Sequence, residues 1–139
     1  MRQADVVSCA TLSTAPLVLG AWLRPGTHVD LVGAFRAQMR ESDDAVMERA
    51  ELIVVDERAA ALAEGGDVAQ ALQSRAIAIS RITGDLRDLV RGIISGRTVA
   101  RQITLFKSVG FALEDLAAAV YGHGAEPAAG DDEAKPQSR

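Results

Sequence analysis

Residues 103–120 read ITLFKSVGFALEDLAAAV, a β-rich run followed by a segment with helical spacing. The run over 103–108 predicts a buried strand, because it is short, rich in β-branched residues and mostly apolar on both faces. After it, an apolar stripe recurs at helical spacing: Val109, Leu113, Leu116 and Val120. The stretch therefore predicts a strand that passes into a helix at Ser108, Val109 and Gly110. In an α/β sheet, such a join is a place where ligands bind.

Three earlier segments have the same strand character, and predicted helices lie between the strands. The strand segments are DVVSCA (5–10), THVDLVGAF (27–35) and ELIVVD (51–56). The helical segments are SDDAVMERA (42–50), DERAAALAEGG (56–66), DVAQALQSRAIA (67–78) and GDLRDLVRGIISG (84–96). Strands that are apolar on both faces belong to parallel sheets covered by helices. The alternation predicts an α/β fold with a doubly wound parallel sheet.

Composition narrows the class of protein and its setting. A chain of 139 residues with 48% hydrophobic residues is long enough for one domain with a real core. The net charge of −4 argues against nucleic acid or an anionic membrane as the main partner. The N-terminal MRQADVV does not resemble a signal peptide, and the single cysteine, Cys9, has no internal partner for a disulfide, so a cytoplasmic setting is expected. Residues 122–139 lack apolar periodicity and are predicted to form a disordered tail.

No G-x-G-x-x-G fingerprint for a dinucleotide diphosphate occurs in the sequence. A doubly wound fold binds its ligand where the strand order reverses, and that point needs strands from both halves of the sheet. The sequence therefore predicts a partial Rossmann fold that lacks its first βαβ half.

Several segments resemble the C-terminal half of the ornithine cyclodeaminase/mu-crystallin family. They are ADVVSCATLSTAPLV, LRPGTHVDLVGAF, MRESDDAVMERAELIVVD, ALAEGGD and ITLFKSVGFALEDLAAA, and the match covers residues 4–121. The resemblance implies an NAD- or NADP-dependent enzyme that reduces cyclic imino acids, that is, ketimines such as Δ1-pyrroline-2-carboxylate. Ornithine cyclodeamination to proline is an alternative, and a non-catalytic remnant or binding module is another. Full-length members of the family are expected to be homodimers.

The resemblance also implies which residues face the cofactor, and all of them follow strands. Ala10 and Thr11 would lie near the ribose; we call them the first segment. Val32, Gly33 and Ala34, the second segment, would lie near the nicotinamide. Ser108, Val109 and Gly110, the third segment, would lie near the carboxamide, with backbone N–H groups at a helix start free to donate. No catalytic residue and no metal ligand is predicted in this chain.

The chain departs from the family pattern at informative positions. Phe35 stands where ornithine cyclodeaminases carry a proton-handling aspartate, and a phenyl ring cannot move a proton. The departure favours the reductase branch. Ala37 and Ser42 replace a usual proline and leucine of that branch, which is expected to loosen the loop. The family's glycine-rich turn and its substrate-gripping lysine and arginine have no counterpart here, so we expect a C-terminal portion of a larger enzyme with an exposed apolar edge at residues 5–10.

Other polar residues have ordinary structural interpretations. Ser42 is a natural N-cap, with Asp43 and Asp44 as partners of the helix dipole. Ser108 is either a cofactor contact or an N-cap. His28 and Cys9 are expected to be structural, and His123 solvated. Arg40 and Glu41 are expected to face solvent, and the glycines of the Gly65-Gly66-Asp67 turn to end a helix.

Overall fold

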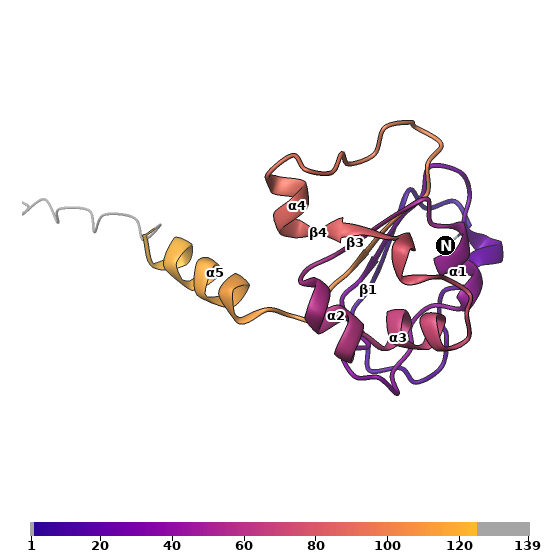
Figure 1. The fold of residues 1–139 in the computed structure, drawn as a ribbon, viewed down its shortest axis with the longest axis horizontal. Helices are drawn as coiled ribbons and strands as arrows, with labels where there is room; N and C mark the ends of the chain where they lie inside the picture. Colours follow the sequence, from indigo (N-terminus) through magenta and orange to yellow (C-terminus); the bar gives the residue numbers. More distant parts are fainter. Residues whose placement is uncertain (1, 125–139) are drawn as a thin grey trace, which may run out of the picture.

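A computed structural model describes residues 2–124 and contains one sheet of five parallel strands (Figure 1). The four predicted strands are all present: β1 (Val6–Cys9), β2 (His28–Leu31), β3 (Leu52–Val55) and β5 (Thr104–Lys107). The helices are α1 (Asp44–Arg49), α2 (Arg58–Glu64), α3 (Gly66–Gln73), α4 (Leu86–Val90) and α5 (Ala112–Gly124), with short 3-10 helices at Gly20–Trp22 and Ile79–Arg81. The predicted parallel α/β sheet is confirmed.

The strand β4 (Ile82–Asp85) was not predicted from the sequence. Its four residues contain a glycine and end on Asp85, which caps α4 by accepting a hydrogen bond from the Asp88 N–H at 3.0 Å. The prediction of one long helix over 84–96 is therefore wrong. Helix α4 ends at Val90, and Gly92 follows with a φ of 70°. Val90 and Ile93, which lie in the range of that predicted helix, are 85% and 67% exposed.

The strands are ordered β1-β2-β5-β3-β4, so the last strand within residues 2–124 lies at the centre of the sheet. Strand β5 pairs with β2 in the register Leu31↔Lys107 and with β3 in the register Val55↔Lys107. Because all five strands are parallel, their carboxyl ends lie along one edge of the sheet. The loops that follow β1, β2 and β5 are therefore neighbours.

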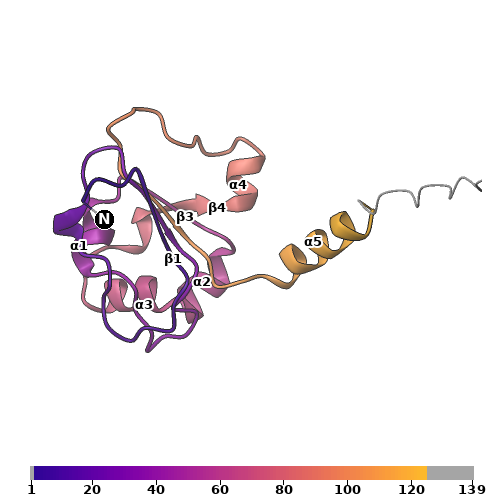
Figure 2. The ribbon, with the colours of Figure 1, turned by 180° about the vertical axis from the view of Figure 1, so that it is seen from behind.

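The two faces of the sheet are covered unequally (Figures 1 and 2). Helices α1, α2 and α3 cover one face, where Val46, Ala61 and Val68 belong to the same core cluster as the strand residues. On the other face, α4 reaches only part of the sheet. Burial on both faces was predicted for every strand, and it holds for β3 but not for β1 or β2, whose residues alternate between buried and more exposed. In β2 the alternation follows the sequence, since polar His28 and Asp30 alternate with Val29 and Leu31.

Strand β1 is an edge strand, as expected. It pairs with β2 alone, and Val6 is 60% exposed.

Helix α5 projects away from the sheet, and its apolar stripe is exposed, with Leu113 and Leu116 each at 58% (Figure 2). The helix runs to Gly124, three residues into the segment 122–139 predicted as a tail, and residues 125–139 lie outside the described part of the chain. Within residues 2–124, no helix has the length and apolar character needed to cross a membrane.

Candidate cofactor site at the carboxyl edge of the sheet

The three predicted cofactor segments lie next to one another along the carboxyl edge. The first follows β1, the second β2 and the third β5, and these strands are consecutive in the sheet. Backbone hydrogen bonds join them: the Val32 N–H donates to the Cys9 carbonyl at 2.7 Å, and the Ser108 N–H donates to the Leu31 carbonyl at 3.0 Å. The structure thus brings together all eight residues that the family resemblance assigned to the cofactor: Ala10, Thr11, Val32, Gly33, Ala34, Ser108, Val109 and Gly110.

The eight residues form a surface of small side chains over a buried layer. Ala10, Val32 and Gly110 are exposed, whereas Gly33, Ala34 and Ser108 are buried. Ala34 has a φ of 48°, a left-handed conformation that is uncommon for a residue with a Cβ and that is held here by surrounding contacts. One of these contacts is the hydrogen bond from the Gly66 N–H to the Ala34 carbonyl at 2.8 Å.

The third segment is held by Asp56, a residue that the sequence analysis did not single out. One carboxylate oxygen, Oδ2, accepts hydrogen bonds from the Ser108 hydroxyl at 2.9 Å and from the Val109 and Gly110 N–H groups at 2.7 and 2.9 Å. The expectation that these N–H groups are free to donate is therefore wrong. Helix α5 begins at Ala112, so Ser108 is not its N-cap.

Glu41 is fully buried, and its expected exposure to solvent is wrong. Its Oε1 accepts a hydrogen bond from the Thr11 N–H at 2.6 Å and so holds the first segment. A Cβ on Gly33 would lie 2.2 Å from this same oxygen. Close packing of the Glu41 side chain against the second segment therefore requires glycine at position 33.

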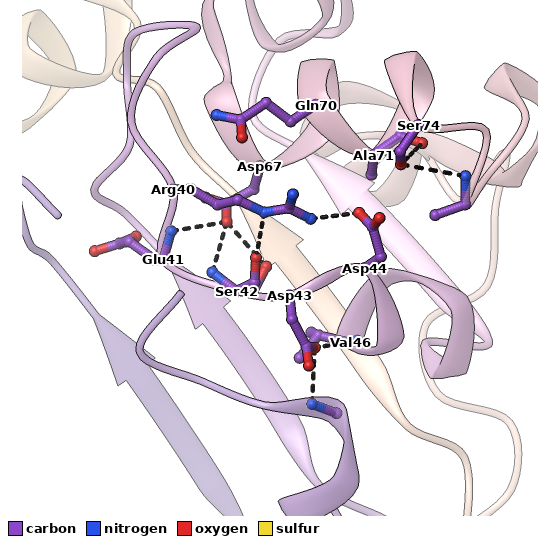
Figure 3. Close-up of polar contacts among 12 residues, drawn as sticks. Arg40, Glu41, Ser42, Asp43, Asp44, Val46, Asp67, Gln70, Ala71 and Ser74 are labelled. Atoms are coloured by element: carbon purple, nitrogen blue, oxygen red, sulfur yellow. Dashed lines mark hydrogen bonds and ion pairs between the residues drawn. The ribbon is translucent and has the colours of Figure 1, made fainter. Parts of the chain in front are cut away.

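Asp67 supports Glu41 from helix α3 (Figure 3). Its Oδ1 accepts hydrogen bonds from the Glu41 and Ser42 N–H groups at 3.0 and 2.8 Å and from the Ser42 hydroxyl at 2.9 Å. Ser42 therefore does not cap α1. Asp43 caps it, accepting from the Val46 N–H at 3.0 Å. The predicted helix termination at the glycine turn is confirmed, because Gly65 lies between α2 and α3.

The loop before α1 is held at several points, which counters the loosening expected from Ala37 and Ser42. The Gln70 amide donates to the Ala37 and Met39 carbonyls, each at 2.9 Å. Arg40, expected to face solvent, has a side chain only 15% exposed and forms an ion pair with Asp44 (Figure 3). The Arg40 guanidinium lowers the pKa of Asp44.

Lys107 is the fourth charged residue buried below the site. Its ammonium donates to the carbonyls of Leu31 at 3.3 Å, Ser108 at 2.7 Å and Gly33. Burial lowers the pKa of Lys107, and the negative charges of Asp67, Glu41, Asp56 and Asp30 oppose that shift. Sequence reasoning placed Lys107 at the strand end but did not predict its burial, because lysine is usually exposed.

The two histidines lie away from this edge. His28 is at the start of β2, where its Nδ1 is 2.8 Å from the Thr104 hydroxyl. This contact with the neighbouring strand β5 fits the expected structural role. Burial lowers the pKa of His28. His123 is exposed on α5. Among residues 2–124, no group of three or more His, Cys, Asp or Glu side chains could hold a metal ion.

Cys9 provides a test of the burial at this edge. The residue is 8% exposed, and burial, together with the charges of Glu41, Asp67 and Asp30, raises the pKa of the thiol. We expect its reaction with Ellman's reagent at pH 8 to be at least about tenfold slower in the folded chain than in urea, because the thiolate is the reactive form. The single cysteine makes the absorbance change unambiguous. Equal rates in the two conditions would contradict the buried position.

Comparisons with known proteins show what this chain is similar to. The sequence profile of the ornithine cyclodeaminase/mu-crystallin family matches residues 1–125. The Δ1-pyrroline-2-carboxylate reductase of Paracoccus denitrificans is 50% identical over 119 residues, which cover 86% of this chain and 37% of the reductase. The ketimine reductase mu-crystallin of Rattus norvegicus is 40% identical over 116 residues, 84% of this chain and 34% of the relative. This chain thus spans little more than a third of the length of these curated relatives.

A solved structure shows the same fold. The Δ1-pyrroline-2-carboxylate reductase of Thermococcus litoralis, in complex with NADH and L-proline, superimposes with a TM-score of 0.81 at 36% identity. The superposition covers 88% of this chain and 40% of that one.

Proposed function

Since the chain belongs to the ornithine cyclodeaminase/mu-crystallin family, we propose that it forms the nicotinamide side of the cofactor site of an NAD- or NADP-dependent enzyme that reduces cyclic imino acids. The observation that carries the proposal is the alignment of the three segments along one edge of a parallel sheet, where this type of fold binds its ligands. The similar reductases from Paracoccus denitrificans and Thermococcus litoralis support the choice of Δ1-pyrroline-2-carboxylate or a related ketimine as substrate.

The residues present suit the nicotinamide end of a dinucleotide. A Cβ on Gly110 would meet no heavy atom within 4 Å, so there is open space beside the third segment for a planar ring. Ala10 and Val32, directly after β1 and β2, add exposed apolar contact area. The diphosphate fingerprint is not among these residues, so the proposal assigns them only the nicotinamide side.

When bound, the reduced cofactor supplies a hydride to the carbon of the substrate's C=N bond. The chain's own residues hold the three cofactor segments in position. Asp56 fixes the third segment, and Glu41 and Lys107 fix the other two from below. None of the eight segment residues carries a side chain that titrates near neutral pH, so the proton for the imine nitrogen must come from elsewhere. Half-buried Phe35 stands where a cyclodeaminase has its aspartate, which favours reduction over cyclodeamination.

A cytoplasmic setting and a homodimeric enzyme complete the proposal. The single cysteine, which has no partner for an internal disulfide, supports the first, and the family resemblance supports the second. Light scattering of the purified protein measures the oligomeric state.

Cofactor binding is tested by an NMR titration of the ¹⁵N-labelled chain with NADH. We expect the amide signals of Gly33, Ala34 and Gly110 to shift, because these residues line the proposed nicotinamide side. AMP, which carries only the adenosine half of the cofactor, is the control and should leave these signals in place. Equal shifts with AMP, or NADH shifts confined to other residues, would contradict the assignment.

The reaction is tested separately in a hybrid enzyme. Residues 4–121 replace the matching segment of the Paracoccus denitrificans reductase, and the absorbance of NADH at 340 nm is followed with Δ1-pyrroline-2-carboxylate. We expect turnover within about tenfold of the parent enzyme, a difference of about 1.4 kcal/mol in the barrier, and no ammonia release from ornithine. A folded hybrid that binds NADH but does not reduce the imine would overturn the substrate class while leaving the cofactor assignment intact.

A further inference from the structure

Lys107 connects two of the cofactor segments through a single buried atom. Its Nζ donates to the Gly33 carbonyl in the second segment, to the Ser108 carbonyl in the third, and to the Leu31 carbonyl at the end of β2. A protonated lysine has three N–H donors, and all three have an acceptor here. A neutral amine has two donors and would leave one carbonyl without its hydrogen bond.

A structural role alone would be served better by an apolar residue. Position 107 points to the helix-covered face, and its neighbours in register, Leu31 and Val55, are fully buried aliphatic residues. Removing an ammonium from water is costly, and Lys107 forms no ion pair among the described residues. The charge is balanced instead by carbonyl dipoles and by the carboxylates of Asp67, Glu41, Asp56 and Asp30 at longer range.

The peptide unit between Ser108 and Val109 is held from both sides by buried charges. Lys107 binds its carbonyl oxygen at 2.7 Å, and Asp56 accepts from its N–H at 2.7 Å. A cation on the oxygen and an anion on the hydrogen fix the orientation of the peptide plane. Because Lys107 also binds the Gly33 carbonyl, the second and third segments cannot move independently while the ammonium is in place.

We propose that Lys107 is a positioning residue that sets the spacing between the second and third segments, and hence the fit of the nicotinamide between them. The proposal rests on the proposed function for its ligand. Its geometric part, a link between Gly33 and Ser108 through the ammonium, stands independently of any cofactor.

The test compares Lys107→Met with Val55→Ala. Methionine keeps the length of the side chain but removes the donors, whereas Val55→Ala loosens the same buried layer without touching a polar atom. We expect NADH to bind Lys107→Met at least about tenfold more weakly than the unmodified chain, as for the loss of charge-assisted hydrogen bonds. Val55→Ala should bind NADH with unchanged affinity, even where urea denaturation shows that it is the less stable variant. Equal losses of affinity in the two variants, or none in Lys107→Met, would overturn the proposal.

A second measurement needs no substitution, because Lys107 and Lys135 are the only lysines in the sequence. Selective ¹³C labelling of lysine therefore gives two sets of side-chain signals. We expect the Lys107 signals to move on addition of NADH and the Lys135 signals to stay in place; unmoved Lys107 signals in a chain that binds NADH would count against the positioning role.

The ligand-free proteins separate this proposal from the proposed function. Without NADH, Lys107→Met should shift the amide signals of Ala34 and Val109 together, since each follows a released carbonyl. If they shift but the unmodified chain does not bind NADH, the link is correct and the cofactor assignment is wrong. If they do not shift, the link itself is wrong.

Discussion

Replacing Asp67 with alanine is expected to lower the free energy of unfolding by about 3–5 kcal/mol, the range for removing one partner of a buried charged network. The side chain is fully buried, and its Oδ1 accepts from two N–H groups and one hydroxyl. Alanine leaves the Glu41 and Ser42 N–H groups buried without acceptors, and each such loss costs about 1–3 kcal/mol. Urea denaturation followed by circular dichroism measures the change.

Two control variants are compared with Asp67→Ala. Asp67→Asn keeps an acceptor oxygen for the same donors, so it should lose clearly less stability than alanine. Asp115→Ala, on the exposed surface of α5, should change the free energy of unfolding by no more than about 0.5 kcal/mol. If Asp67→Ala lowers the free energy of unfolding as little as Asp115→Ala does, the hydrogen bonds of Asp67 with Glu41 and Ser42 do not contribute to stability.

Gly33→Ala is expected to have the second large effect, and it acts on stability and cofactor binding together. The added Cβ would lie 2.2 Å from both the Glu41 Oε1 and the Thr11 carbonyl oxygen, and 2.5 Å from the Thr11 nitrogen. These atoms are buried or belong to the backbone, so relief requires the first and second segments to move apart. We expect a loss of about 3 kcal/mol, at the upper end of the usual cost of overpacking, and a weaker affinity for NADH.

The control is Gly96→Ala, at a glycine with space around it. The nearest heavy atom to a Cβ at position 96 is the Leu89 Cδ1, at 3.9 Å. This variant should unfold at nearly the same urea concentration as the unmodified chain. Wild-type stability and NADH affinity in Gly33→Ala would mean that Glu41 does not pack against the second segment as described.

The sequence was most informative where local composition decides the structure. Leu52–Val55 is a continuous run of large aliphatic residues, and such a run can satisfy both faces of a buried strand, so β3 was predicted with its correct environment. In His28–Leu31, the polar alternation indicated that one face of β2 is more open. The predicted burial of both faces neglected that pattern. Gly84 and Asp85 of β4 give little strand signal of their own, and this strand is stabilised by its pairing with β3.

The buried hydrogen bonds of Glu41, Asp56, Asp67 and Lys107 could not be predicted, because they join residues far apart in the chain. Asp56 and Gly110 are 54 positions apart, and Lys107 and Gly33 are 74 apart. Nothing local distinguishes a glutamate that is buried, such as Glu41, from one that is solvated, such as Glu114. The eight segment residues, by contrast, were implied by the family resemblance, and their position at one edge followed from the strand ends, because parallel strands bring those ends together.

The central position of β5 has a consequence for how the chain folds during its synthesis. Strands β1 and β2 can pair early, and β3 and β4 can pair later, but β5 lies between the two pairs. The pairs therefore cannot join into one sheet until residues 104–107 have left the ribosome. The core can close cooperatively only after β5 has entered the sheet between β2 and β3. Its contacts join residues far apart in the chain, and such long-range contacts slow folding. Nascent chains stalled before residue 104 should therefore be sensitive to protease, and those stalled after β5 has emerged should be resistant.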